Sequence, residues 1–123
     1  MGKFVIGLEV NGKHHFNLVA PNGEIIGTSQ GYESEETCMI GIHSVRENAN
    51  SVVEDQTVEN PPHYPNPKFE IFFGINDQYY FHLKAKNGLI VLASEGYIAK
   101  ESCYNGIKSV GINAPDAVIE HEA

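Results

Sequence analysis

The chain has no tryptophan, only two cysteines and no apolar run close to the roughly 18 residues that a transmembrane helix requires. Cys38 and Cys103 are too few for the disulfide framework of a small secreted domain, so we expect reduced, buried thiols in a cytoplasmic protein. Pairing of the two thiols across a pseudo-twofold axis is the alternative. The first residues lack the long apolar stretch of a secretory signal. Apolar residues nevertheless make up 41% of the 123 residues, which is typical of a globular domain.

Basic residues are also scarce. Eight Lys and Arg stand against 16 Asp and Glu, which gives a formal charge of −8. Nucleic-acid affinity rests mainly on Lys and Arg that displace counterions from phosphate, so this charge argues against a nucleic-acid partner. It argues equally against an anionic membrane. The simplest interpretation of the acidic surface is solubility.

The sequence contains the same block twice. A shift of 65 residues aligns the chain with itself without a gap. The matches include Asn22-Gly23 with Asn87-Gly88, Cys38 with Cys103, Gly41 with Gly106 and Ser44 with Ser109. We therefore divide the chain into a first repeat (1–59), a linker (60–67) and a second repeat (68–123), with both repeats in one globular domain. Four of the eight linker residues are proline, which favours an extended spacer over a partner motif at His63 and Tyr64.

Each repeat shows the same order of predicted elements, β-β-β-α-β. Apolar residues alternate with others around residues 4–8 and 16–20 and predict two strands. Asn22-Gly23 predicts a two-residue hairpin turn, which leads into a third strand ending at Gly31. A short apolar run closes each repeat, Val52-Val53 in the first and Ala117–Ile119 in the second.

Helices are predicted over residues 35–48 and 100–113. Apolar or small residues recur there at helical spacing, in the first repeat at Cys38, Ile42, Val45 and Ala49. Gly41 on the same stripe would let the helix approach its sheet closely. Ser34 is expected to cap the first helix, whereas Ala99 stands at that position in the second repeat and removes the cap.

The register of the hairpins decides which side chains share a face of the sheet. A three-residue loop, Val10-Asn11-Gly12, pairs Ile6 with Phe16 and keeps the apolar residues together, whereas a two-residue turn would split them. The face toward the helices then comprises Phe4, Ile6, Leu8, Phe16, Leu18, Ala20 and Ile25, and in the second repeat Phe69, Ile71, Phe73, Phe81, Leu83, Ala85, Ile90 and Leu92.

The opposite face, which we expect no helix to cover, is mixed in character. It carries Val5, His15, Asn17, Val19, Ile26 and Thr28, and then Glu70, Phe72, Tyr80, His82, Lys84, Val91 and Ala93. An antiparallel sheet can leave one face in water, but an exposed apolar patch tends to mark a contact site. Phe72, Tyr80, His82 and Lys84 are therefore our candidate binding residues. Ordinary scattered surface apolar residues are the alternative.

Four ordered motifs resemble a known family. Phe69–Ile71, Phe81–Gly88, Ala93–Tyr97 and Ser102–Val110 are similar to the repeats of the YegP-like family, also called UPF0339, a family of unknown function. The resemblance covers both repeats. It implies an α+β fold of tandem β-β-β-α-β repeats that share one antiparallel sheet and exchange their C-terminal strands, with two helices on one face. The first repeat departs from the family pattern at Gly7-Leu8 and His14-His15, which weakens a binding role for those positions.

No pattern for catalysis, metal binding or a cofactor is visible. His14 and His15 are adjacent on a strand and point to opposite faces, and no His-x-x-x-His or Cys-x-x-Cys spacing occurs. Nothing supplies a nucleophile elbow or a glycine-rich phosphate loop. We therefore expect no catalytic residue, no metal and no cofactor.

Three hypotheses about function follow. The first is a non-enzymatic module that binds an unknown protein or a small ligand through the helix-free face, as a monomer or a weak homodimer. The second is single-stranded nucleic-acid binding by aromatic stacking on the sheet, which the charge of −8 disfavours. The third is a small thiol-dependent enzyme that uses Cys38 or Cys103 near a helix start. We favour the first.

Overall fold

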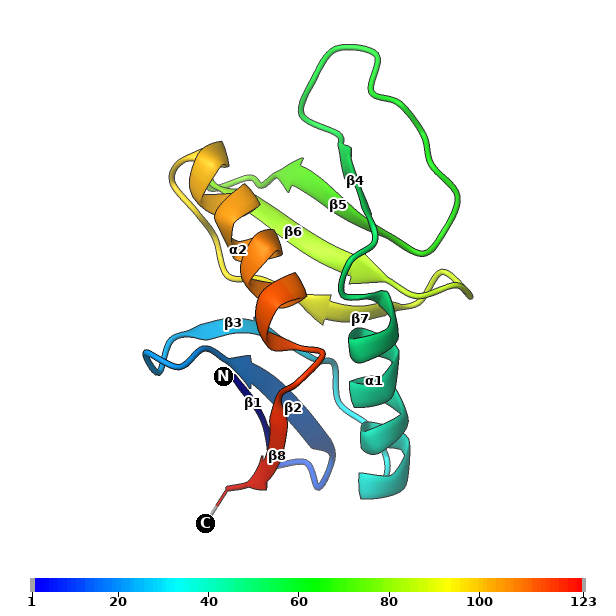
Figure 1. The fold of residues 1–123 in the computed structure, drawn as a ribbon, viewed down its shortest axis with the longest axis vertical. Helices are drawn as coiled ribbons and strands as arrows, with labels where there is room; N and C mark the ends of the chain where they lie inside the picture. The colour runs from blue at the N-terminus through cyan, green and yellow to red at the C-terminus, as the bar shows by residue number, and fades with distance from the viewer. Residues whose placement is uncertain (1, 123) are drawn as a thin grey trace.

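Both helices lie on one face of an eight-stranded sheet in the computed structural model, which describes residues 2–122 (Figure 1). The first unit comprises β1 (Lys3–Leu8), β2 (His14–Val19), β3 (Ile25–Thr28), α1 (Glu35–Asn48) and β4 (Val52–Asp55). The second unit comprises β5 (Lys68–Phe73), β6 (Tyr79–Lys84), β7 (Ile90–Ala93), α2 (Lys100–Asn113) and β8 (Val118–His121). The predicted α+β class and both predicted helix ranges are confirmed. Within residues 2–122, no helix has the length and apolar character needed to cross a membrane.

The last strand of each unit lies in the other half of the sheet. The strand order is β4-β5-β6-β7-β3-β2-β1-β8, so β4 completes the second half and β8 completes the first. The halves join between β3 and β7, where Thr28 pairs with Ala93. The exchange implied by the family resemblance is therefore present. Both exchanged pairs are parallel, however, so the sheet is mixed and not wholly antiparallel as expected. A parallel pair needs a long connection, and residues 56–67 provide it between β4 and β5.

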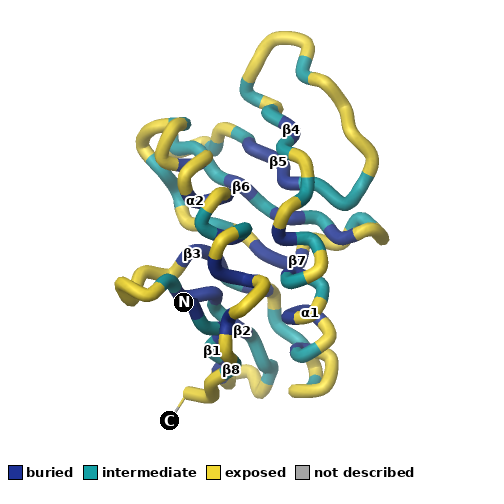
Figure 2. The backbone as a smooth tube through the Cα atoms, in the orientation of Figure 1, coloured by how far each residue is buried: buried dark blue, intermediate teal, exposed yellow. Residues whose placement is uncertain are grey.

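The core lies between the sheet and the two helices. In Figure 2 the buried segments gather in the middle of the strands and on the inner sides of both helices. Phe4 and Phe16 meet edge to face with ring centroids 5.6 Å apart, and Phe69 and Phe81 repeat the contact at 5.8 Å. All four rings are buried beneath the helices, as the predicted alternation requires.

The start of each helix follows the predicted difference in capping. Ser34 Oγ accepts a hydrogen bond from the Thr37 N–H at 3.1 Å, and Thr37 Oγ1 accepts one from the Ser34 N–H at 3.3 Å. This reciprocal pair satisfies two N–H groups that the first turn of a helix leaves free. Ala99 makes no such side-chain bond at the start of α2.

The first hairpin has the predicted register. Ile6 pairs with Phe16 and Phe4 with Leu18 across the three-residue loop. Gly12 has a φ of +85°, in the left-handed region that favours glycine. Asp77 stands at the equivalent position of the second unit and adopts a φ of +62° there.

The second hairpin of each unit differs from the predicted two-residue turn. The Ala20 N–H donates to the Glu24 carbonyl, so the loop contains three residues, and a bulge at Ile26 follows. The extra loop residue and the bulge cancel in the register of the strands, so Leu18 pairs with Gly27 as expected. Between them, however, Ile25 pairs with Val19 and is 42% exposed, while Ile26 enters the core.

The second unit repeats this exchange of positions. Ile90 is 40% exposed opposite Lys84, and Val91 lies in the core. The predicted faces are therefore wrong at Ile25, Ile26, Ile90 and Val91. Leu8 and Phe73 were also predicted to be in the core, but each is the last residue of its strand, and both are largely exposed.

Candidate functional site

The four candidate residues lie together on the helix-free face. Phe72 pairs with Tyr80 across β5 and β6, and His82 and Lys84 follow at alternate positions of β6. The rings of Phe72 and Tyr80 are stacked with centroids 5.7 Å apart, and the His82 ring lies 5.0 Å from Phe72. All four side chains are half-buried. The structure thus brings the predicted residues into one patch, which we call the aromatic patch.

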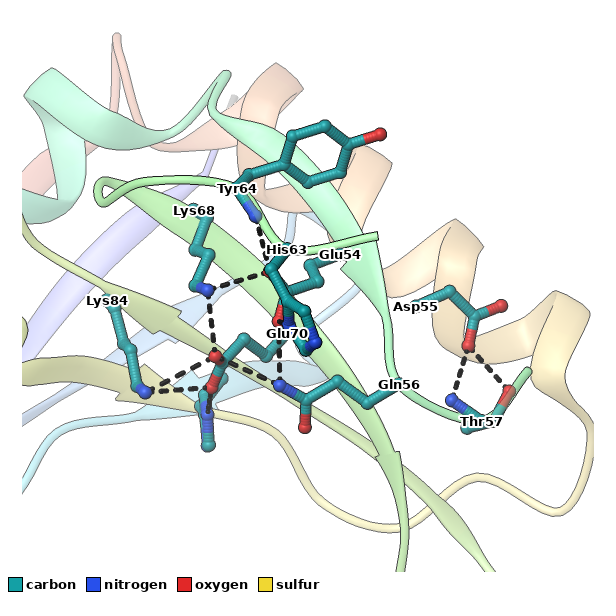
Figure 3. Close-up of polar contacts among 10 residues, drawn as sticks. Glu54, Asp55, Gln56, Thr57, His63, Tyr64, Lys68, Glu70 and Lys84 are labelled. Carbon is teal, nitrogen blue, oxygen red and sulfur yellow. Dashed lines mark hydrogen bonds and ion pairs between the residues drawn. The ribbon is translucent and has the colours of Figure 1, made fainter. Parts of the chain in front are cut away.

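Sequence reasoning missed a buried ion network beside the aromatic patch (Figure 3). At its centre is Glu54 on β4, which has no exposed surface. Its carboxylate accepts hydrogen bonds from Lys68 Nζ at 2.7 Å, the Tyr64 backbone N–H at 2.7 Å and Gln56 Nε2 at 2.8 Å. The linker therefore closes over this carboxylate with one of its own N–H groups.

Glu70 extends the network to the aromatic patch. It lies 3.3 Å from Lys68 Nζ and 3.1 Å from Lys84 Nζ, and His82 Nε2 hydrogen bonds to it. Glu54 pairs with Glu70 across β4 and β5, and Glu70 pairs with His82 across β5 and β6. Three adjacent strands thus place two carboxylates against two ammonium groups, which offsets the cost of burying each charge.

The electrostatics keep both carboxylates ionised. Hydrogen bonds from Lys68, Gln56 and the Tyr64 backbone lower the pKa of Glu54 to about 2. Burial raises the pKa of Glu70, but hydrogen bonds from His82 and Lys84 outweigh it and leave the pKa below its ordinary value. The hydrogen bond to Glu54 raises the pKa of Lys68. The charged state of the network is therefore its stable state near neutral pH.

The first unit has an exposed counterpart of this network. At a shift of 65 residues the sequence counterpart of Glu54 is Ile119. The loop after α2 is one residue longer than the loop after α1, however, so Glu120 occupies the position in the sheet that corresponds to Glu54. Lys3 and Glu120 lie 3.3 Å apart, but their side chains are 42% and 51% exposed, against 11% and 1% for Lys68 and Glu54. Within residues 2–122, no linker covers that pair.

The network and the thiols offer little chemistry. Within residues 2–122, no group of three His, Cys, Asp or Glu could hold a metal ion. Cys38 and Cys103 are both free and buried, and burial raises the pKa of each thiol to about 11. Both thiols are therefore protonated near neutral pH, and the thiolate that nucleophilic catalysis needs is scarce.

Acid is expected to destabilise the fold through this network. The pKa of Glu54 is about 2 in the folded chain against an ordinary value of 4.5, so the unfolded chain binds its proton first as the pH falls. The stability that Glu54 contributes is then present above about pH 4.5 and is lost as the pH falls toward about 2. Chemical unfolding followed by circular dichroism at stepped pH would measure this loss.

The matched controls for the acid experiment are two substitutions to glutamine. Glu54→Gln should give a shallower fall in stability with acid, because it removes the titrating group. Glu120→Gln should leave the fall unchanged, because that side chain is half exposed. Equal slopes for wild type and Glu54→Gln would contradict the assignment of the acid response to Glu54.

Sequence comparison with known proteins finds a matching family model and similar proteins. The model of the family described as "Domain of unknown function (DUF1508)" matches residues 10–55 and 76–120. The UPF0339 protein YegP of Yersinia pestis is 37% identical over 120 residues, which cover 98% of this chain and 95% of the relative. A UPF0339 protein of Methanosarcina acetivorans is 57% identical over 49 residues, which are 40% of this chain and 84% of the relative. That relative therefore has about the length of one unit.

Two solved structures have the same fold. The solution NMR structure of yegP from E. coli, a protein of unknown function, has a TM-score of 0.81 and 30% identity and covers 98% of this chain and 92% of that one. The solution NMR structure of a UPF0339 protein from Shewanella oneidensis has a TM-score of 0.79 and 32% identity and covers 98% and 90%. With the matched segments and the shared topology, the chain belongs to the DUF1508 family, whose function is unknown.

Proposed function

We propose that the chain is a non-enzymatic module that binds a partner protein through the aromatic patch on its helix-free face. The difference between the two units carries this proposal. On the helix side the units match, with phenylalanine, isoleucine or leucine at equivalent positions. On the other face Gly7, His15 and Asn17 stand where the second unit has Phe72, Tyr80 and His82. Both units form the same strands, so the fold itself does not require aromatic residues there.

The shape of the patch favours a protein over a small molecule. Small-molecule sites are concave, and the cavities within residues 2–122 that we describe are lined by residues other than Phe72, Tyr80, His82 and Lys84. Ile90, which is 40% exposed opposite Lys84, adds apolar surface to the same face. An apolar surface patch with polar neighbours is typical of protein contacts.

The net charge of the chain indicates which kind of partner protein would bind the aromatic patch. The chain has a formal charge of −8, whereas the ion network beside the patch contains two carboxylates and two ammonium groups. An apolar contact surface surrounded by basic residues would therefore complement the aromatic patch and the net negative charge of the chain. The network supports such a surface by holding His82 and Lys84 in place, since Glu70 contacts both.

The test is capture of a partner with matched surface variants. The double variant Phe72→Ser/Tyr80→Ser removes the aromatic patch, and Val5→Ser/His15→Ser changes the equivalent face of the first unit. We expect a partner that wild type and the control variant retain and the Phe72→Ser/Tyr80→Ser variant loses by tenfold or more. Amide spectra of each variant would verify that it is folded.

Mapping with the purified partner decides the result. Addition of the partner should shift the amide signals of β5, β6 and β7 and leave those of β1 and β8 unchanged. A partner that binds the Phe72→Ser/Tyr80→Ser variant as well as wild type would overturn the proposal. So would shifts confined to the helix side.

A further inference from the structure

Two cavities of similar size lie where the units meet, on the side of the helices. The first, of about 250 Å³, lies between the β2–β3 hairpin and α2. The second, of about 210 Å³, lies between the β6–β7 hairpin and α1. Each cavity is thus formed by the hairpin of one unit and the helix of the other. We call them the α2 cavity and the α1 cavity.

The two cavities are built from equivalent residues. Asn22 and Ser109 line the α2 cavity, and their counterparts at a shift of 65, Asn87 and Ser44, line the α1 cavity. A tyrosine lines each cavity as well, Tyr97 or Tyr32, and stacks on the buried phenylalanine of its unit. These are positions at which the two sequence repeats are identical. Turn formation explains the asparagines. Each serine hydroxyl accepts a hydrogen bond from the asparagine one helical turn later, Asn48 or Asn113, and keeps its own O–H free to donate.

A glycine in each helix makes room for the tyrosine. A Cβ atom at Gly106 would lie 2.4 Å from Tyr97 Oη, and one at Gly41 would lie 2.3 Å from Tyr32 Oη. Both distances are too short for a real contact, so the glycines serve the tyrosine rings as well as the packing of helix on sheet. Within residues 2–122 neither hydroxyl has a hydrogen-bond partner, and burial raises the pKa of both. Each cavity therefore offers a neutral hydroxyl group that no other side chain of the described residues occupies.

The cavities differ at their rims. Glu24 and Asn105 line the α2 cavity, where the α1 cavity has Leu89 and Ile40. Leu89 is 58% exposed and Ile40 is 63% exposed, although both are large apolar side chains. Glu24 is exposed and forms no ion pair within the described chain. One rim thus has a free carboxylate, and the other has two unpartnered apolar side chains.

We propose that the two cavities are small-molecule sites that have diverged, the α2 cavity for an organic cation and the α1 cavity for a neutral, largely apolar molecule. The shared tyrosine and serine hydroxyls supply hydrogen bonds in both sites. Glu24 supplies the charge that attracts an ammonium group, and the Tyr97 ring adds a favourable surface for it. When an apolar group of the ligand covers the side chains of Leu89 and Ile40, the removal of their apolar surface from water favours binding. These sites are separate from the aromatic patch and do not depend on the proposed function.

The test uses two probes of the same shape, benzylamine as the cation and benzyl alcohol as the neutral molecule. Each is titrated into the full chain to about 10 mM, which covers affinities in the millimolar range, while amide signals are recorded. Benzylamine should shift Glu24, Tyr97 and Ser109, and benzyl alcohol should shift Tyr32, Ser44 and Leu89. The proposal would be overturned if neither probe shifted the signals of its region, or if both probes shifted the signals of the same region.

Two reciprocal variants test the selecting residues. Glu24→Leu should weaken benzylamine binding in the α2 cavity by up to about fivefold, the upper end of what an exposed ion pair contributes. Leu89→Glu should create benzylamine binding in the α1 cavity and weaken benzyl alcohol there. Both substitutions lie on exposed loop positions, so the fold should tolerate them. Unchanged selectivity in both variants would contradict the role given to these residues.

Discussion

Replacing Lys68 with methionine is expected to lower the free energy of unfolding by about 3 kcal/mol, the lower end of what breaking a buried ion pair costs. Lys68 Nζ lies 2.7 Å from Glu54, whose carboxylate has no exposed surface. Methionine keeps most of the side-chain volume but leaves that carboxylate without its ammonium partner. Urea unfolding of both proteins near neutral pH measures the difference.

Lys3→Met is the matched control for Lys68→Met. Lys3 forms the equivalent pair with Glu120 in the first unit, but both side chains are about half exposed. Its loss should cost at most about 1 kcal/mol, as for other surface pairs. Equal losses for the two variants would show that burial by the linker is irrelevant to the strength of the pair.

Two further readouts separate lost charge pairing from lost packing. The cost of Lys68→Met should shrink as the pH falls, because the variant removes the main cause of the lowered pKa of Glu54 and protonation then neutralises that side chain. The double variant Glu54→Gln/Lys68→Met should recover part of the stability, because no unpaired charge is buried. A cost that is independent of pH and unchanged in the double variant would indicate packing alone.

Residues 68–123 expressed alone are expected to fold only as a homodimer. In the full chain β4 completes the sheet beside β5, and β8 pairs with β1 of the other unit. A single unit therefore lacks a partner for its last strand and leaves the edge of β7 open. Two copies can supply both, in the way that symmetric oligomers complete one another.

Concentration dependence measures this prediction. The thermal midpoint of the isolated unit should rise with concentration, and sedimentation should report a dimer that dissociates and unfolds on dilution. The full chain serves as the control, and its midpoint should not change over the same range. A folded monomer of residues 68–123 would contradict the mutual completion of the two halves. The relative of Methanosarcina acetivorans, about one unit long, is a natural subject for the same measurement.

Local sequence patterns were sufficient to predict much of the fold. The spacing of apolar residues predicted both helices, because residues at i, i+4 and i+7 lie on one face of a helix. The alternation of side chains also predicted the first hairpin, since the alternative register would have placed Phe16 and Leu18 on the same face as Gly7 and Val5 and split the apolar residues between the two faces. The same parity argument failed at the second hairpin, where a longer loop and a bulge at Ile26 cancel in register but exchange Ile25 and Ile26.

The polar features were harder to predict because they depend on tertiary contacts. Lys68 and Glu70 could be placed on one face from their alternation in the sequence. Glu54, however, joins them only because β4 crosses to the other half of the sheet and the linker then covers it. The two cavities pose the same difficulty, since each combines a hairpin from one unit with a helix from the other. Four candidate residues were placed correctly on their face, and whether they bind a partner stays a prediction.

The linker has a consequence for any protein made by joining two equal halves end to end. A single connecting segment can lie against only one half, and here it shields Glu54 while Glu120 is about half exposed. The two halves therefore experience different environments even where their side chains are identical. The same substitution is therefore expected to cost more at the sheltered pair than at the open pair. Each half of the sheet is thus subject to a separate set of structural constraints.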